Sequence, residues 1–410
     1  MHRQFMENDK TSDTTSQFSL YIHVPFCQTK CPNCDFNTYS GIEYLTKNYL
    51  DALVTEIRQW GPLLTGMDAR SIFFGGGTPS YISVDHIEQI LYASQSSFDV
   101  NDSAEITIET NPGDLSISYA SSLRRIGVNR LSLGTQSLDD SLLQVIGRRH
   151  SAKGAMLAYD AARTAGFDNI NLDFMYGLPY QSMDQWNQTL RAMIDMSPEH
   201  LSLYCLTLED GTPLKKNVDA GHIPEPDADL AAEMYLVADS TLKSAGYVQY
   251  EISNWCRPGR ESQHNLNYWY NNRYLGLGPG AHSFLGNYRF KNINAPVKYI
   301  KSLDQKFSTT GEHVPGALTE TVLQQIPSVD AIEYINPQLE MAETMMLSLR
   351  LMHGISSTAF RNRFGVGLLS TYGKQIRECE DLDLLVFDED ILRLSENGRL
   401  LSNEVFVKFF

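Results

Sequence analysis

The chain of 410 residues lacks any apolar run approaching the roughly 20 residues needed to span a bilayer. Residues 1–17 are polar and contain no apolar core of a secretory signal. We therefore expect a disordered tail at residues 1–17, no transmembrane segment and a cytoplasmic protein.

Positive charge is also scarce. The chain has 33 Lys and Arg against 49 Asp and Glu, a formal net charge of −16. Nucleic-acid sites and anionic membrane surfaces both require clustered Lys and Arg. The composition thus predicts no nucleic-acid partner, and membrane contact only through partner proteins.

Cysteine is rare, with six residues in the whole chain, and three of the six lie within eight residues. A disulfide framework would spread its cysteines through a short secreted chain. This pattern instead indicates reduced thiols and one metal site.

The first half of the chain alternates between strand-like and helical segments. Strand-like segments occur at residues 19–26, 71–74, 105–109, 130–133, 170–174 and 200–206, with helical spacing between them. Such alternation predicts parallel β/α units and an α/β fold. We expect a partial (β/α)6 TIM-like barrel over residues 18–255, although periodicity alone fits a doubly wound open sheet nearly as well.

The second half has a different texture. Residues 256–328 are rich in Asn, Tyr, Gly and Pro, which predicts a loop-rich region and a connection. Residues 329–410 are expected to form a small C-terminal winged-helix-like α+β domain. Its expected elements are a helix at 339–352 and short strands at 384–386, 391–394 and 405–410.

The cysteine cluster has the spacing Cys27-x3-Cys31-x2-Cys34 and follows the first strand. Thiolates are soft ligands that suit zinc or iron–sulfur clusters. A structural zinc site needs four ligands, and no fourth lies nearby. A cubane held by three cysteines leaves one iron open. A three-ligand zinc site and a group of reactive thiols are the alternatives.

Glycines and polar residues follow the expected strands. They are Gly76, Gly77, Thr78, Glu109, Gln136, Arg148 and Asp173. In a β/α barrel the carboxyl ends of the strands build the site. Glycines let the backbone approach a ligand, carboxylates accept hydrogen bonds from ribose hydroxyls, and Arg or amide groups hold a carboxylate. Each residue also has a structural explanation, such as a cap or a loop contact. Asp173 is the hardest to explain that way, because an unpaired carboxylate in an apolar strand is costly.

These motifs resemble the radical S-adenosylmethionine superfamily. They are most similar to the subgroup that contains oxygen-independent coproporphyrinogen III oxidase. The resemblance is carried by residues 21–27, 75–80, 109–113, 130–136 and 171–179, and near the C-terminus by 394–398 and 401–405. It implies a [4Fe–4S] cluster on Cys27, Cys31 and Cys34, whose open iron is chelated by S-adenosylmethionine. It further implies that Tyr21 and the glycines and polar residues named above contact S-adenosylmethionine.

Two features separate the branches of this subgroup. The oxidases typically carry a further cysteine two residues after the third, where this chain has Phe36. The stretch His264-Asn-Leu-Asn-Tyr-Trp269 includes an imidazole, a common haem-iron ligand, and aromatic rings that could cover a porphyrin. From the residues alone, an aromatic loop with a hydrogen-bonded histidine is the better interpretation.

The same stretch matches the HNxxYW motif of haem chaperones of the HemW family. That resemblance implies haem binding through His264, Asn265, Tyr268 and Trp269, with His264 as axial ligand and His282 as a weaker second candidate. It implies a chaperone that passes haem to haem-requiring respiratory proteins, with no catalytic residue assigned, and it leaves a homodimer open. The alternative is an oxidase that decarboxylates coproporphyrinogen III through radicals.

Overall fold

The computed structural model describes residues 16–304 and 318–410. The expected tail lies outside the described residues as far as residue 15, and β1 begins two residues later. Within the described ranges, no helix is long and apolar enough to cross a membrane.

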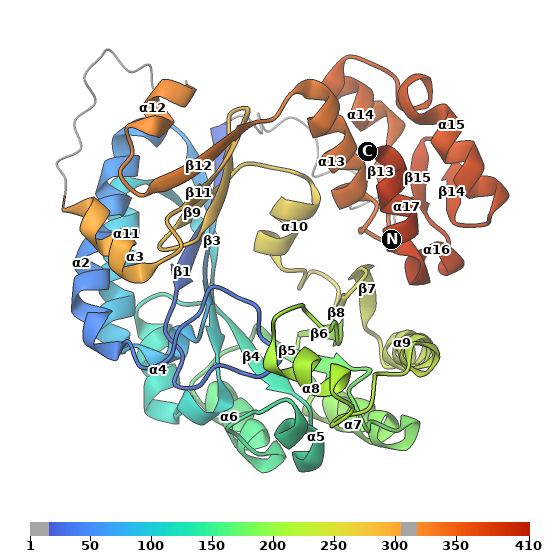
Figure 1. The fold of residues 1–410 in the computed structure, drawn as a ribbon, viewed down its shortest axis with the longest axis horizontal. Helices are drawn as coiled ribbons and strands as arrows, with labels where there is room; N and C mark the ends of the chain where they lie inside the picture. The colour runs from blue at the N-terminus through green and yellow to red at the C-terminus, as the bar shows by residue number, and fades with distance from the viewer. Residues whose placement is uncertain (1–15, 305–317) are drawn as a thin grey trace.

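Six parallel strands form the core of the large domain. They are β1 Gln17–Val24, β2 Asp68–Gly76, β3 Asp99–Thr110, β4 Arg130–Gln136, β5 Ile170–Tyr176 and β6 His200–Cys205. Each strand pairs in parallel with the next one in the chain, so all six carboxyl ends lie along one rim. The sheet curves strongly (Figure 1). The α/β partial-barrel prediction is confirmed.

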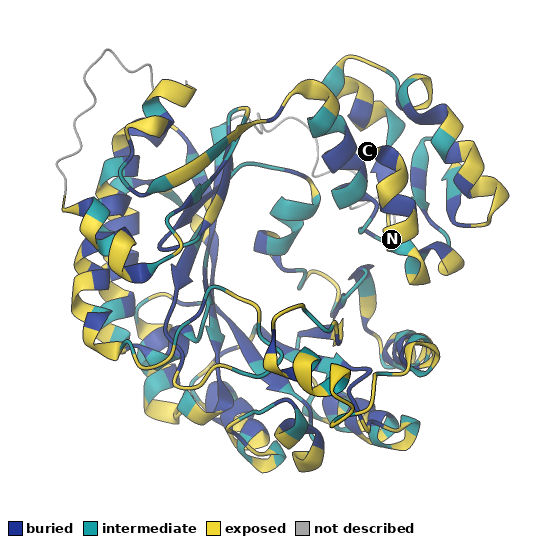
Figure 2. Ribbon diagram, in the orientation of Figure 1, coloured by how far each residue is buried: buried dark blue, intermediate teal, exposed yellow. Residues whose placement is uncertain are grey.

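Helices cover the convex side of this sheet, with their exposed residues facing outward (Figure 2). They are α2 Thr46–Trp60, α3 Val84–Ser97, α4 Ile117–Arg125, α5 Asp140–Val145, α6 Ala152–Thr164, α7 Met183–Met196 and α9 Ala228–Ser244. Helix α8 Pro213–Asp219 lies instead beside the loop after β1, where the Leu214 amide donates to Pro32 O. Helix α7 illustrates why they form. A capping box of Ser182 and Gln185 starts it, and Trp186, Leu190 and Met193 are buried one turn apart.

Further strands extend the sheet at both edges. Beyond β1 lie β9 Tyr274–Leu277, β10 His282–Leu285, β11 Tyr288–Asn292 and β12 Val329–Tyr334, and beyond β6 lie β8 Asn254–Cys256 and β7 Val248–Glu251. Two helices, α11 Pro296–Leu303 and α12 Glu320–Gln324, follow β11.

The loop-rich prediction for residues 256–328 is therefore wrong over β9 to β11. These strands are short, and they form because β9 pairs with the distant β1. Strand β12 pairs with β11, so it belongs to the large sheet and the small domain begins after it, not at residue 329. The buried Glu56 carboxylate stabilises this extension by accepting hydrogen bonds from the Gly278 amide and the Asn292 side chain.

A short helix, α10 Gln263–Trp269, lies on the concave side of the sheet (Figure 1). A loop was expected here, and seven residues are too few for a stable isolated helix. Two caps explain why it forms. Ser262 Oγ accepts from the Asn265 amide, and the Glu105 carboxylate accepts from the amides of Gln263 and His264.

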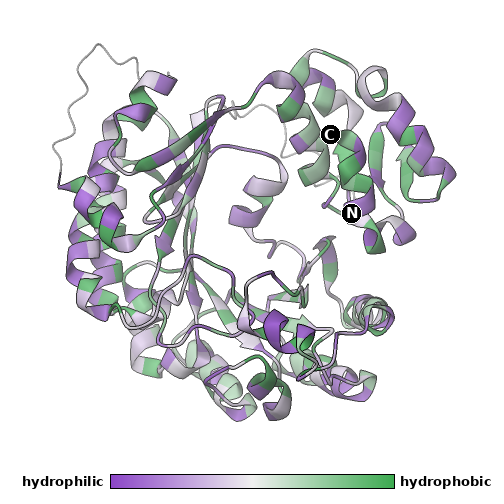
Figure 3. Ribbon diagram, viewed as in Figure 1, coloured by the Kyte–Doolittle hydropathy of each residue, from purple (hydrophilic) through white to green (hydrophobic). Residues whose placement is uncertain are grey.

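The C-terminal domain has its own hydrophobic core (Figure 3). Its elements are α13 Pro337–Ser348, β13 Ile355–Ser356, α14 Ser357–Phe364, α15 Leu368–Asp381, β14 Leu385–Asp388, β15 Ile391–Leu394, α16 Glu396–Leu400 and α17 Ser402–Phe406. Two helices followed by a hairpin agree with the winged-helix-like α+β prediction. The strand expected at 405–410 is wrong, because Phe406 and Phe409 bury their rings with helical spacing.

Candidate functional site

The three clustered cysteines lie in the loop after β1. Cys27 is buried, whereas Cys31 and Cys34 are partly exposed. Thr78 Oγ1 donates to Cys27 Sγ at 3.6 Å, and Arg148 Nη1 donates to Cys31 Sγ at 3.5 Å. Burial raises the pKa of the Cys27 thiol. Donors aimed at sulfur suit iron–sulfur ligation, because hydrogen bonds to ligand sulfurs tune such clusters.

Within residues 16–304 and 318–410, no three His, Cys, Asp or Glu side chains are arranged so that they could hold a metal ion. The assignment of Cys27, Cys31 and Cys34 to a [4Fe–4S] cluster stays a prediction.

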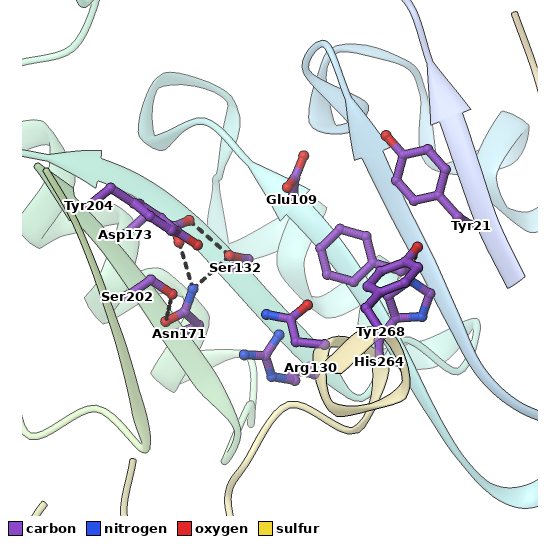
Figure 4. A pocket seen from close by; sticks show the side chains of 12 residues that line it. Tyr21, Glu109, Arg130, Ser132, Asn171, Asp173, Ser202, Tyr204, His264 and Tyr268 are labelled. Atoms are coloured by element: carbon purple, nitrogen blue, oxygen red, sulfur yellow. Dashed lines mark hydrogen bonds between the residues drawn. The ribbon is translucent and has the colours of Figure 1, made fainter. Parts of the chain in front are cut away.

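Three of the expected S-adenosylmethionine residues line one interior cavity of about 200 Å³. Tyr21, Glu109 and Asp173 come from β1, β3 and β5, and Figure 4 shows them around this space. Glu109 Oε2 accepts from the Gly76 amide at 3.2 Å. Asp173 accepts from Ser132 Oγ at 2.8 Å.

Burial acts on the protonation of both carboxylates. Burial, and secondarily the charge of Asp173, raise the pKa of Glu109 to about 8. Burial also raises the pKa of Asp173, against the hydrogen bonds that it accepts. Two ionised carboxylates in one cavity are stabilised by hydrogen-bond donors or by a cation. A ligand with ribose hydroxyls and a positively charged sulfonium group supplies both.

Gln136 and Arg148 lie at the end of β4, beside the cysteine loop. Gln136 takes the left-handed backbone conformation, with φ of 64°. Arg148 Nη2 donates to Gly134 O at 2.7 Å, while its buried Nε has no hydrogen-bond partner among the described residues. An unpaired guanidinium N–H beside a cluster thiol fits a ligand carboxylate.

The structure gives Gly76 and Gly77 a different role from the one expected. Gly76 has φ of +109°, and a Cβ on Gly77 would lie 2.6 Å from Phe26 O. The Gly77 amide donates to Val24 O and the Thr78 amide to Phe26 O. Close packing of the end of β2 against β1 thus requires these glycines, and their contact with S-adenosylmethionine stays a prediction.

His264 of the haem motif lines the same cavity (Figure 4), where α10 contacts Ser71 and Phe73 of β2 and Glu105 of β3. Its side chain is 1% exposed and stacks on Phe73, with ring centroids 4.9 Å apart. Its Nδ1 lies 2.8 Å from Ser71 Oγ, and its Nε2 lies 3.0 Å from the Tyr268 hydroxyl.

These partners assign the His264 tautomer. Ser71 Oγ donates its own hydrogen to Ser19, so it accepts the hydrogen of Nδ1. Nε2 then carries a lone pair that accepts from the Tyr268 hydroxyl. Burial lowers the pKa of His264 to about 3, so the ring is neutral at physiological pH.

The other haem candidates lie in different surroundings. Asn265 and Tyr268 line the cavity with His264. Trp269 faces the C-terminal domain, where the Arg350 guanidinium lies 4.6 Å from its ring. His282 is exposed at the start of β10 and is not part of the cavity wall. The structure thus brings three of the four motif residues together with the expected cofactor residues.

Two further residues of this region, Glu105 and Arg130, are not expected from the sequence. Arg130 lines the cavity at 2% exposure, and its Nε lies 3.9 Å from the Glu105 carboxylate that caps α10. The signal for Glu105 was present. In Glu-Ile-Thr-Ile-Glu, residues 105 to 109, alternate residues of a strand share a face, so Glu105 points the same way as Glu109.

Comparison with known proteins agrees with this architecture. The radical SAM superfamily matches residues 21–193, and the HemN C-terminal domain matches residues 335–401. The solved structure of the coproporphyrinogen III oxidase HemN from Escherichia coli aligns with a TM-score of 0.81. That alignment covers 99% of this chain and 93% of that one, at 21% identity, and it shows a shared fold. Fold and site together define a radical SAM protein with a HemN-type C-terminal domain.

Full-length relatives show which family of this class the chain belongs to. The chain is 33% identical to the heme chaperone HemW of Bacillus subtilis over 95% of this chain and 98% of that protein. It is 33% identical to the heme chaperone HemW of Mycobacterium tuberculosis, covering 95% and 93%. A mitochondrial radical S-adenosyl methionine domain-containing protein 1 of Danio rerio is 35% identical, covering 99% and 89%. This chain belongs to the heme chaperone HemW family.

Proposed function

We propose that this protein binds haem through His264 and delivers it to haem-requiring respiratory proteins, while holding a [4Fe–4S] cluster and S-adenosylmethionine. The observation that carries the proposal is the protonation and hydrogen bonding of His264. Its ring is neutral, Nδ1 is anchored on Ser71 Oγ, and the Nε2 lone pair is left as the ligating atom. Neutral imidazole with its other nitrogen hydrogen-bonded is the usual metal-ligating form of histidine.

The resident cofactors would occupy the carboxyl-terminal rim of the barrel. Cys27, Cys31 and Cys34 would bind three irons, and the Arg148 guanidinium would hold the methionine carboxylate of S-adenosylmethionine. Glu109 and Asp173 would accept hydrogen bonds from its ribose and amine groups. When bound, the cluster supplies an electron that can cleave S-adenosylmethionine.

Haem binding requires a change at α10. His264 is buried, and the Tyr268 hydroxyl occupies its Nε2. The helix must shift, or Tyr268 must turn away, before iron can reach that nitrogen.

The oxidase alternative fits the cavity less well. Coproporphyrinogen III carries several carboxylates that need cations. The cavity wall holds Glu109 and Asp173 but one cation, Arg130, which lies beside Glu105. Phe36 also stands where the oxidases have an extra cysteine. We propose that the protein does not decarboxylate coproporphyrinogen III.

One experiment separates the two functions. The protein is purified anaerobically, its cluster is rebuilt, and haem binding and coproporphyrinogen III decarboxylation are assayed side by side. We expect a Soret band with wild type and no decarboxylation. His264→Ala should weaken haem binding at least about tenfold, or about 1.4 kcal/mol, and His282→Ala serves as the matched histidine control. Protoporphyrinogen formed at enzymatic rates would refute the chaperone, and haem binding unchanged in His264→Ala would refute the ligand assignment.

A further inference from the structure

A series of hydrogen-bonded side chains runs from Asp173 and Asn171 in the cavity wall to His200 and Tyr250 behind it. Asn171 Nδ2 donates to Asp173 Oδ1 at 2.8 Å (Figure 4), and His200 Nδ1 lies 2.6 Å from Asn171 Oδ1. On its other side, His200 Nε2 lies 2.8 Å from the Tyr250 hydroxyl. The Tyr250 oxygen accepts from the Ser262 amide at 3.4 Å.

The hydrogens of this chain all point the same way. The Asn171 amide nitrogen faces Asp173, so its oxygen faces His200 and must accept a hydrogen from Nδ1. Nε2 of His200 then accepts from the Tyr250 hydroxyl, whose oxygen is free to accept from Ser262. Burial lowers the pKa of His200 well below its usual value, which keeps this tautomer neutral. Hydrogen bonds in series polarise one another, so the chain directs positive charge toward Asp173.

The far end of the chain is the start of α10. Ser262 is the N-cap of that helix, and its Oγ also donates to the Glu105 carboxylate at 3.4 Å. The position of Ser262 therefore determines where α10 begins, two residues before His264. The two ends of the chain are a proposed S-adenosylmethionine ligand and the support of the proposed haem ligand.

We infer that His200 and Tyr250 are positioning residues that join the Asp173 carboxylate to the N-terminus of α10, so that both ligand sites depend on one hydrogen-bond chain. The inference rests on the proposed function for the identity of the two ligands. Neither residue lines the cavity, and each acts through its neighbours in the chain.

The test compares two tyrosines in the full-length, cluster-rebuilt protein. Tyr250→Phe removes the hydroxyl in the middle of the chain. Tyr247→Phe is the matched control, because Tyr247 is also a buried tyrosine but its hydroxyl donates to Pro198 O, outside the hydrogen-bond chain. The measurements are the affinity for S-adenosylmethionine by equilibrium dialysis and amide hydrogen exchange in residues 263–269.

Tyr250→Phe should weaken S-adenosylmethionine binding about three- to tenfold and speed exchange in α10 by a similar factor, as expected for one lost buried hydrogen bond. Tyr247→Phe should change neither. A merely local role for Tyr250 would alter α10 alone, so unchanged S-adenosylmethionine affinity in Tyr250→Phe overturns the inference. Equal effects in both variants overturn it as well.

A second variant separates this inference from the proposed function. Asp173→Asn changes the acceptor at the other end of the chain, and α10 exchange is then measured without any ligand. Faster exchange supports the chain, and unchanged exchange contradicts it. If the wild-type protein bound no S-adenosylmethionine, the proposed cofactor would be refuted. The exchange measurement on Asp173→Asn would still test the hydrogen-bond chain.

Discussion

The carboxyl-terminal rim of the barrel and its floor, formed by α10, differ in the exposure and hydrogen bonding of their candidate functional side chains. At the rim, Cys31 and Cys34 are partly exposed and the buried Nε of Arg148 has no partner among the described residues. On the floor, formed by α10, His264 is buried and both of its ring nitrogens are hydrogen-bonded. The rim is ready to receive a ligand, whereas the floor must first open.

This difference teaches how one scaffold can hold resident cofactors and a transient cargo. Resident cofactors need a preformed site, because every group ordered beforehand saves free energy at binding. A cargo that must leave again benefits from a site that recloses, because the reclosed contacts compete with the cargo. The predictions below test whether the two regions are independent and how strongly the floor is closed.

The largest effect should come from the rim. Cys31→Ala removes one of the three proposed cluster ligands and should lower the iron content of the rebuilt protein more than about tenfold, since even indirect supporting contacts cost 10- to 100-fold. Haem binding should persist, because His264 lies on the floor. Iron analysis and the Soret band provide the two readings. The control is Cys205→Ala, because Cys205 is an exposed cysteine at the end of β6. Loss of haem binding in Cys31→Ala would show that the regions are not independent.

A smaller effect is expected from protonation at the rim. The pKa of Glu109 is about 8 in the folded protein, against an ordinary value near 4.5. Between these values the folded state holds a proton that the unfolded state has released, so this group lowers the stability as pH rises. In protein without S-adenosylmethionine, Glu109→Gln should remove this pH dependence. Its free energy of unfolding should gain roughly 3–4 kcal/mol relative to wild type between pH 5 and pH 8.

Denaturant unfolding at several pH values measures this gain. Glu88→Gln, on the exposed face of α3, should parallel wild type throughout. A gain that stays constant with pH would mean that Glu109 is ionised in the fold.

The smallest effect should come from opening the floor. Tyr268→Phe removes the hydroxyl that occupies Nε2 of His264 and leaves the ring packed on Tyr274. Haem binding should tighten a few-fold, because about 1 kcal/mol of competing hydrogen bond is lost. Spectrophotometric haem titration measures it, with Tyr270→Phe as a neighbouring control. Weaker binding would indicate that Tyr268 itself contacts haem.

Much of the rim followed from the sequence. Cys27, Cys31 and Cys34 lie close together in the chain, so their spacing alone predicts a shared site. Glu109 and Asp173 lie 64 residues apart in the chain, yet parallel strands in chain order place their carboxyl ends on one edge of the sheet. The cavity wall shared by Tyr21, Glu109 and Asp173 is the outcome of that rule.

The floor did not follow in the same way. His264 was expected in a loop, and it lies in a helix inside the barrel, bonded to a serine 193 residues earlier in the chain. The Glu105 cap lies 159 residues from the His264 amide that it accepts from. No local pattern encodes such contacts, and a seven-residue helix has too little propensity of its own to be predicted.

The sequence by itself thus predicted the candidate ligand residues, the β/α alternation and the family, because residue chemistry and periodicity are local properties. Only the tertiary structure decided that the haem motif and the cofactor residues line one cavity and that the motif is closed. It also decided that buried hydrogen bonds connect the two. The physical reason is that burial and the choice of hydrogen-bond partner depend on which distant segments pack together, and that choice is made by the whole fold.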